Sequence, residues 1–390
     1  GPQSSMSASH PPAPSDGGTP ELHVVTGDDT GLVKVVDLAQ KAVLRRFGGP
    51  QSMDRGITQM AWARDLLSEA DANQHVVTCS RGGMLQCRNV ADGSVVSDWS
   101  DLKLDAKKCT GLGVLGAKRL LACTQSGGAK IWMSEGGKAA SVVDTIKCGE
   151  NVERMTLSPD RSSFAVGGDE LLLRVIDLKT EKQRFKARNV KPDKLDLRYP
   201  VHILDIAYIP GAIEKIVTGT AHHQVRFYDT KTKPRAIWSA LLGENAITAV
   251  LALPDGKTIV AGDAAGETLQ MDTRMSGRVI GKFKGVGGSI TSLQHDPSGK
   301  YLASTSLDRF VRLYEINGKK KLVNKVYLKQ RLSCCLFPGI EDEQGAKDAK
   351  KELDIDARDD AVWDVLDSRK RVKMKESNET GKPICKKQKT

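Results

Sequence analysis

The chain has 390 residues, of which 39% are hydrophobic and 27% are charged, and its formal net charge is +11. The apolar fraction supports a packed core, but no stretch reaches about eighteen apolar residues, so neither a membrane span nor a signal peptide is visible. The eight cysteines fall mostly inside strand-like runs without a CxxC pair, which excludes a zinc ribbon and favours a reducing compartment. The positive charge favours partners such as nucleic acid or ribonucleoprotein particles.

Residues 1–20 are predicted to stand apart from the fold. The opening GPQSSM has the composition of an expression scar. The Ser-, Pro- and Gly-rich stretch after it cannot bury enough surface to order itself. We therefore expect the folded domain to span residues 21–338.

A repeat fills this domain. Seven times, an apolar β-type run ending in small residues is followed by a short turn and a second run that ends near an acid. The copies lie roughly 43 to 52 residues apart and begin at His23, His75, Leu120, Phe164, Lys215, Thr258 and Tyr301. A self-similar period of this length is typical of repeat architectures, whose usual work is to hold partners.

Two further strands are predicted between successive copies. One follows each acidic end, as in RVIGKFK from Arg278, and the other precedes the next copy, as in ITAVLALP from Ile247. Turns such as LPDGK and DPSGK join first and second strands. Runs such as VRFYD and VRLYE alternate apolar residues with arginine, which predicts half-covered strands with the arginines on the other face.

Seven sets of four strands predict an all-β fold, a seven-bladed β-propeller. The chain begins at the second strand of its first set, and the missing first strand is found only at RLSCCLF, residues 331–337. We expect this C-terminal strand to pair with residues 22–28, which closes the ring and removes a sheet edge.

The sets resemble degenerate WD repeats. The acid expected at the end of the third strand is present as Asp37, Asp177, Asp229, Asp272 and Glu315, but the preceding Trp is replaced. The turn aspartate of the repeat survives clearly as Asp308, where we expect an internal hydrogen-bonding role. Residues 185–211, GTAHHQVRFYD from Gly219 and SLDRFVRLYE from Ser306 resemble the family of WD repeat-containing protein 74 and its fungal counterpart. Lys194 departs from that pattern, because a Trp is expected there.

The connection between the fourth and fifth sets is unusually long and charged. In a propeller it shares a face with the turns at His222 and at Asp308. The predicted docking patch for an assembly partner or rRNA phosphates comprises Lys186, Arg188, Lys191, Asp193, Lys194, Asp196, Arg198, His223 and Arg309. The alternative is a loop ordered by its own ion pairs. His222 and His223 are adjacent and form no metal site with their surroundings, so no metal and no cofactor is expected.

Two sequences imitate catalytic motifs. GLGVLG at 111–116 matches a dinucleotide fingerprint but leads into another strand instead of a helix, so we interpret it as a turn within a blade. LPDGKT, which ends at Thr258, contains GKT but lacks the upstream glycine of a phosphate loop and is interpreted as a hairpin turn. Neither GxSxG nor HExxH occurs, and an enzyme is not expected.

Residues 339–390 are predicted to form a flexible charged tail. Residues 339–367 hold 4 basic and 11 acidic residues, and residues 368–390 hold 9 basic and 2 acidic residues. The basic residues expected to direct nuclear import or touch rRNA are Arg369, Lys370, Arg371, Lys373, Lys386, Lys387 and Lys389. Val362, Trp363 and Leu366 would lie on one side of a short helix that orders on a partner. The alternative is a solvated basic end.

Two functional classes remain open. The resemblance implies a non-enzymatic scaffold in the nucleus and nucleolus that binds proteins of large-ribosomal-subunit precursors, with pre-rRNA as a further candidate partner. It also implies release by an AAA-type ATPase and a monomer within a larger particle. The alternative is a propeller adaptor for a ubiquitin ligase or a chromatin complex, for which an acidic central pocket with aromatic walls would be the expected sign.

Overall fold

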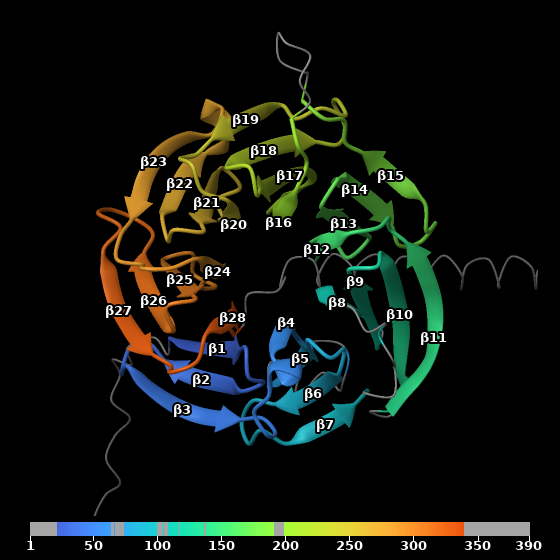
Figure 1. Ribbon diagram of the computed structural model, residues 1–390, viewed down its shortest axis with the longest axis vertical. Coiled ribbons are helices and arrows are strands. Elements are labelled where there is room, and N and C mark those ends of the chain that lie inside the picture. Colours follow the sequence, from blue (N-terminus) through green and yellow to red (C-terminus); the bar gives the residue numbers. More distant parts are fainter. Residues whose placement is uncertain are drawn as a thin grey trace, which may run out of the picture.

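The computed structural model describes residues 22–63, 66, 74–99, 104, 108–116, 118–135, 138–190 and 199–338. They form seven four-stranded antiparallel sheets arranged as blades of a ring (Figure 1). The predicted all-β, seven-bladed propeller is confirmed. The predicted N-terminal arm and C-terminal tail lie outside the described residues.

Each blade runs from an innermost strand a to an outermost strand d (Figure 1). Blade 1 contains β28 (Leu332–Leu336), β1 (His23–Asp28), β2 (Val33–Asp37) and β3 (Ala42–Phe47); blade 2 contains β4 (Ile57–Trp62), β5 (His75–Ser80), β6 (Leu85–Asn89) and β7 (Val95–Asp98); blade 3 contains β8 (Cys109–Gly116), β9 (Arg119–Thr124), β10 (Gly128–Glu135) and β11 (Lys138–Lys147). Blade 4 contains β12 (Val152–Leu157), β13 (Ser163–Gly168), β14 (Leu171–Asp177) and β15 (Gln183–Lys186); blade 5 contains β16 (Ile203–Ile209), β17 (Ala212–Thr220), β18 (Gln224–Asp229) and β19 (Trp238–Leu241). Blade 6 contains β20 (Ile247–Ala252), β21 (Thr258–Asp263), β22 (Thr268–Asp272) and β23 (Arg278–Phe283), and blade 7 contains β24 (Ile290–His295), β25 (Tyr301–Ser306), β26 (Phe310–Glu315) and β27 (Leu322–Tyr327).

The described helical segments include two short 3-10 helices, η1 (Met53–Arg55) and η3 (Thr273–Met275). No helix in the described part of the chain is long and apolar enough to cross a membrane.

The core lies between neighbouring blades. Between blades 1 and 2, for example, Val25, Val33, Ile57, Trp62 and Val76 pack in one buried cluster. Because each sheet has a blade on either side, strand c is covered on both faces. The prediction of half-covered strands is therefore wrong: Arg226 of β18 is 2% exposed and Arg312 of β26 is 4% exposed.

The glycine-rich sequence at 111–116 is strand, not a turn, so that interpretation is also wrong. It lies within β8, which is paired with β9. A Cβ atom on Gly111 would come within 2.5 Å of the Cβ and backbone oxygen of Met155 in β12, and Gly113 lies against Leu157. These glycines therefore allow the innermost strands of blades 3 and 4 to approach closely.

The ring closes as expected from the sequence. Strand β28 pairs antiparallel with β1, and Leu336 lies opposite Val25. The indole Nε1 of Trp62 in blade 2 donates to the backbone oxygen of Phe337 at 2.8 Å. The C-terminal strand is therefore bonded to the blade that it completes and to the next blade.

Backbone hydrogen bonds define two faces of the ring. On the first, the turn between strands b and c bonds to the residue before strand a of the same blade, as from Leu307 N to Ser289 O at 3.0 Å. On the second, the residue after strand c bonds to the residue before strand b, as from Ile316 N to Lys300 O at 2.8 Å. We call the first the loop face and the second the turn face. The expectation that d–a connections and b–c turns share a face is correct.

Candidate partner-binding faces

Four of the nine residues of the predicted docking patch are described: Lys186, Arg188, His223 and Arg309. The other five, Lys191, Asp193, Lys194, Asp196 and Arg198, lie outside the described residues, as do all of the predicted tail residues. The structure therefore bears on the base of the long connection and on the b–c turns of blades 5 and 7.

The base of the connection is a basic cluster at the outer seam between blades 4 and 5. Lys186 ends β15, and both Lys186 and Arg188 are exposed. The backbone nitrogen of Arg188 donates to Pro234 O at 2.7 Å, and Arg188 forms a parallel bridge with Arg235, also exposed. We call Lys186, Arg188 and Arg235 the seam patch. Sequence reasoning missed Arg235, because its neighbour Arg188 comes from another blade and no local pattern reveals the pairing.

Asn189 holds the two ends of the long connection together. Its side-chain nitrogen donates to Tyr199 O at 2.7 Å, and its side-chain oxygen accepts from Arg226 Nη1 at 3.1 Å. The buried Arg226 guanidinium also donates from Nε to Gln224 Oε1 at 2.8 Å. The seam patch is therefore positioned by a hydrogen-bonded base that is itself anchored inside blade 5.

His223 and Arg309 lie in the b–c turns of their blades, both with a positive φ. His223 O accepts from Leu242 N at 2.8 Å, which ties this turn to the connection after β19. Arg309 is exposed, and its Nη1 lies 3.5 Å from Tyr327 Oη, a long and weak hydrogen bond. The two residues share the loop face but belong to blades 5 and 7, so the predicted residues do not form one cluster.

Asp308 has the structural role expected for it. It accepts from Arg312 at 2.5 Å and 3.0 Å, from Ser306 Oγ at 2.5 Å and from Phe310 N at 3.1 Å. Burial acts to raise the pKa of Asp308, but the hydrogen bonds from Arg312 and Ser306 outweigh it and lower the pKa to about 2. Asp308 is therefore a fixed anion that holds the b–c turn of blade 7 to strand c.

A second carboxyl group that holds a b–c turn is that of Asp28, which sequence reasoning missed. Its Oδ1 accepts from Thr30 N and Leu32 N, each at 3.0 Å, and its Oδ2 lies 3.0 Å from Lys34 Nζ. The buried Lys34 also donates to Leu328 O at 2.7 Å and Gln330 Oε1 at 2.6 Å. This pair therefore links blade 1 to the segment that leads into β28.

Polar side chains also meet on the innermost strands. Arg154 of β12 donates to Gln59 of β4 at 3.3 Å and lies 2.8 Å from Asp205 of β16. Burial raises the pKa of Asp205 although Arg154 lies beside it. Because its carboxylate already has a cationic partner, Asp205 does not provide the open acidic pocket expected of the adaptor alternative.

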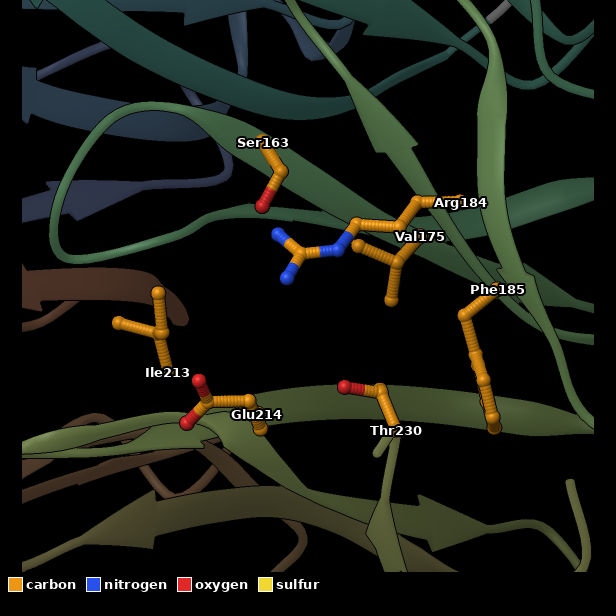
Figure 2. A pocket seen from close by; sticks show the side chains of 7 residues that line it. All are labelled: Ser163, Val175, Arg184, Phe185, Ile213, Glu214 and Thr230. Atoms are coloured by element: carbon orange, nitrogen blue, oxygen red, sulfur yellow. The ribbon is translucent and has the colours of Figure 1, made fainter. Parts of the chain in front are cut away.

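A small cavity lies between blades 4 and 5. Figure 2 shows the Arg184 guanidinium reaching into it from one side, with Glu214 and Thr230 on the other. Its volume of about 10 Å³ is enough for a single water molecule, and Glu214 is paired with Lys231. The cavity is too small for a substrate. No group of three or more His, Cys, Asp or Glu residues that could hold a metal occurs in the described part of the chain.

The seven closed four-stranded blades define a β-propeller of the WD-repeat class. A model of the WD domain, G-beta repeat, matches residues 277–315. The chain is 32% identical to bovine WD repeat-containing protein 74 over 92% of its own length and 93% of that protein, and 31% identical to the human protein over 90% and 91%. It is 27% identical to ribosome biogenesis protein NSA1 of Yarrowia lipolytica over 52% of this chain and 56% of that protein. The chain belongs to the WD repeat-containing protein 74 family.

Proposed function

We propose that the chain is a non-enzymatic scaffold in ribosome biogenesis. The name of the NSA1 relatives supports the process, and the propeller supports the role, because a rigid ring with exposed loops is suited to holding several partners. The observation that carries the proposal is the seam patch, where two arginines of different blades lie side by side on paired backbone.

The seam patch supports docking of an acidic protein surface or of phosphate groups. Lys186, Arg188 and Arg235 are exposed and form no ion pair within the described residues. Guanidinium groups suit the binding of such anions, because the planar group donates two parallel hydrogen bonds to one carboxylate or phosphate. The hydrogen-bonded base at Asn189 would reduce the entropy lost when the patch meets its partner.

The family resemblance extends this proposal. The particle would be a precursor of the large ribosomal subunit, the compartment would be the nucleolus, and pre-rRNA would be a partner beside the assembly proteins. An AAA-type ATPase would remove the scaffold once assembly has advanced. The tail residues from Arg369 to Lys389 would direct nuclear import.

Co-sedimentation of the tagged chain with pre-ribosomal particles tests the proposal. The wild-type chain should migrate with particles, and the triple variant Lys186→Glu, Arg188→Glu, Arg235→Glu should shift to the free fractions. A matched control, Arg45→Glu, Arg46→Glu, Lys147→Glu, reverses three exposed charges on β3 and β11 and should still co-sediment. A wild-type chain found only in the free fractions would contradict the proposal, and an equal loss in the control would remove the seam patch from it.

A further inference from the structure

The turn face carries exposed cations across blades 5 to 7. They come from the a–b and c–d turns, which backbone hydrogen bonds join within each blade: Thr273 N donates to Lys257 O at 2.9 Å and Ile316 N to Lys300 O at 2.8 Å. We call those among them that are exposed, lie outside the seam patch and form no ion pair within the described residues the basic rim. They are Lys233, Lys257, Arg278, Lys300, Lys319 and Lys321. Lys231 and Arg274 are also exposed but pair with Glu214 and Asp272.

Contacts between blades make this rim continuous. Trp238 of blade 5 donates from Nε1 to Thr273 O of blade 6 at 3.1 Å. The side chain of Lys320 in blade 7 lies so close to Gly281 of blade 6 that a Cβ there would come within 2.0 Å of its Cε atom. Strand β19 of blade 5 is therefore bonded to the c–d turn of blade 6, and the c–d turn of blade 7 packs against strand β23 of blade 6.

Four aspartates of the same turns accept hydrogen bonds from the backbone. Asp229 accepts from Lys231 N at 2.9 Å, Asp255 from Lys257 N and Thr258 N, and Asp296 from Tyr301 N at 2.7 Å. Asp272 accepts from Arg274 N and pairs with the Arg274 guanidinium. The hydrogen bonds from Arg274 lower the pKa of Asp272, so it stays ionised in this arrangement. These carboxylates shape the turns, while the rim cations extend into solvent and form no ion pair within the described residues.

From this arrangement we infer that the basic rim binds the phosphate backbone of double-stranded RNA. Several cations held along one surface release counterions when they meet closely spaced phosphates. The aromatic ring beside the rim, Trp238, is already stacked on Phe227 and bonded to Thr273, unlike the open stacking platforms of proteins that bind single strands. Recognition would therefore be of backbone shape and not of bases, as for most double-stranded RNA. The inference deepens the proposed function by naming RNA as a partner and giving it a face away from the b–c turns.

Fluorescence anisotropy of the purified full chain with an RNA duplex of roughly 20 base pairs tests this, with salt as the variable. The rim variant is Lys233→Gln, Arg278→Gln, Lys300→Gln, Lys321→Gln. A matched control, Arg45→Gln, Arg46→Gln, Arg81→Gln, Lys147→Gln, removes four exposed cations elsewhere. The rim variant should bind at least roughly tenfold more weakly near physiological salt, with the slope of log K against log salt reduced by about 3 to 4. The control should bind like the wild type.

Folding of the rim variant is checked by its circular dichroism and melting temperature. A charge-retaining variant, Lys233→Arg, Lys300→Arg, Lys321→Arg, should keep the wild-type affinity. Unchanged RNA binding in the rim variant, or equal losses in the rim variant and the control, would overturn the inference. The inference would also be overturned if the rim variant lost binding to a synthetic peptide of the acidic residues 341–367 while its RNA binding stayed unchanged. The assay needs no particle, so its failure is distinguishable from a failure of the proposed scaffold role.

Discussion

The pKa values of the Asp308 and Asp205 carboxyl groups are shifted in opposite directions within one ring. Asp308 has a pKa lowered to about 2, because Arg312 and Ser306 favour its ionised form more than burial disfavours it. Asp205 has a raised pKa, because burial outweighs Arg154 and the backbone nitrogens that donate to it. A carboxyl group whose pKa is lowered by folding stabilises the fold above its unfolded-state pKa, and this stability is lost as pH falls through its folded-state pKa. A carboxyl group whose pKa is raised by folding favours the fold at low pH, and this stability is lost as pH rises through its folded-state pKa.

We therefore predict different pH profiles for two variants. At pH 7, Asp308→Asn should lower the free energy of unfolding by about 2 to 3 kcal/mol, because Arg312 is left buried without its anion. This loss should shrink as pH falls from about 4 towards 2, where the wild-type carboxyl is protonated too. Asp205→Asn should lower the free energy of unfolding by less than Asp308→Asn does at pH 7. Its stability relative to the wild type should increase as pH rises.

Urea denaturation of both variants and the wild type between pH 3 and pH 7 gives these differences. Opposite slopes with pH would support the two assignments. Equal costs at pH 7 that do not change with pH would show that neither charge matters to the fold.

At the scale of elements, β28 is the strand on which closure depends. Leu332, Cys335 and Phe337 are buried in a cluster with Val24 and Val36 of blade 1 and residues of blade 7. Losing β28 would expose these groups, leave β1 as an open edge and remove the hydrogen bond from Trp62. Three buried side chains at about 1.5 to 3 kcal/mol each approach the whole stability of an ordinary domain.

A chain that ends after Gln330 should therefore fail to fold, whereas a chain that ends after Pro338 should melt within a few degrees of the full chain. Circular dichroism with heating distinguishes the two. A cooperative melt of the shorter chain near the full-length temperature would contradict the closing role of β28.

The strands were predictable because their signals are local. Period-two runs such as QVRFYD, turn residues at Asp255 and Gly256, and the first-strand pattern displaced to 331–337 all identify elements without knowledge of their neighbours. What escaped prediction depends on contacts between blades. Gly111 approaches Met155 of the next blade too closely for a side chain, Arg226 is buried because blades cover both faces, and Arg235 meets Arg188 through a bridge between blades.

On the scale of the whole molecule, the ring separates two kinds of surface. The seam patch lies at the outer junction of blades 4 and 5, while the basic rim follows the turn face of blades 5 to 7. Under the two proposals, the seam patch would hold a protein and the basic rim an RNA, and the two surfaces meet at the c–d connection of blade 5, which carries both Arg235 and Lys233. The rigid stacking of blades keeps the distance between the two surfaces fixed.

Crosslinking of the tagged chain within isolated pre-ribosomal particles, with the contacted residues mapped by mass spectrometry, tests this division most directly. Protein crosslinks should concentrate near Lys186 and around the connection from 190 to 199, and RNA crosslinks should concentrate on the rim, near Lys233, Lys300, Lys319 and Lys321. Particles that yield no crosslinks to the propeller, or crosslinks spread evenly around the ring, would contradict a scaffold with two distinct binding faces.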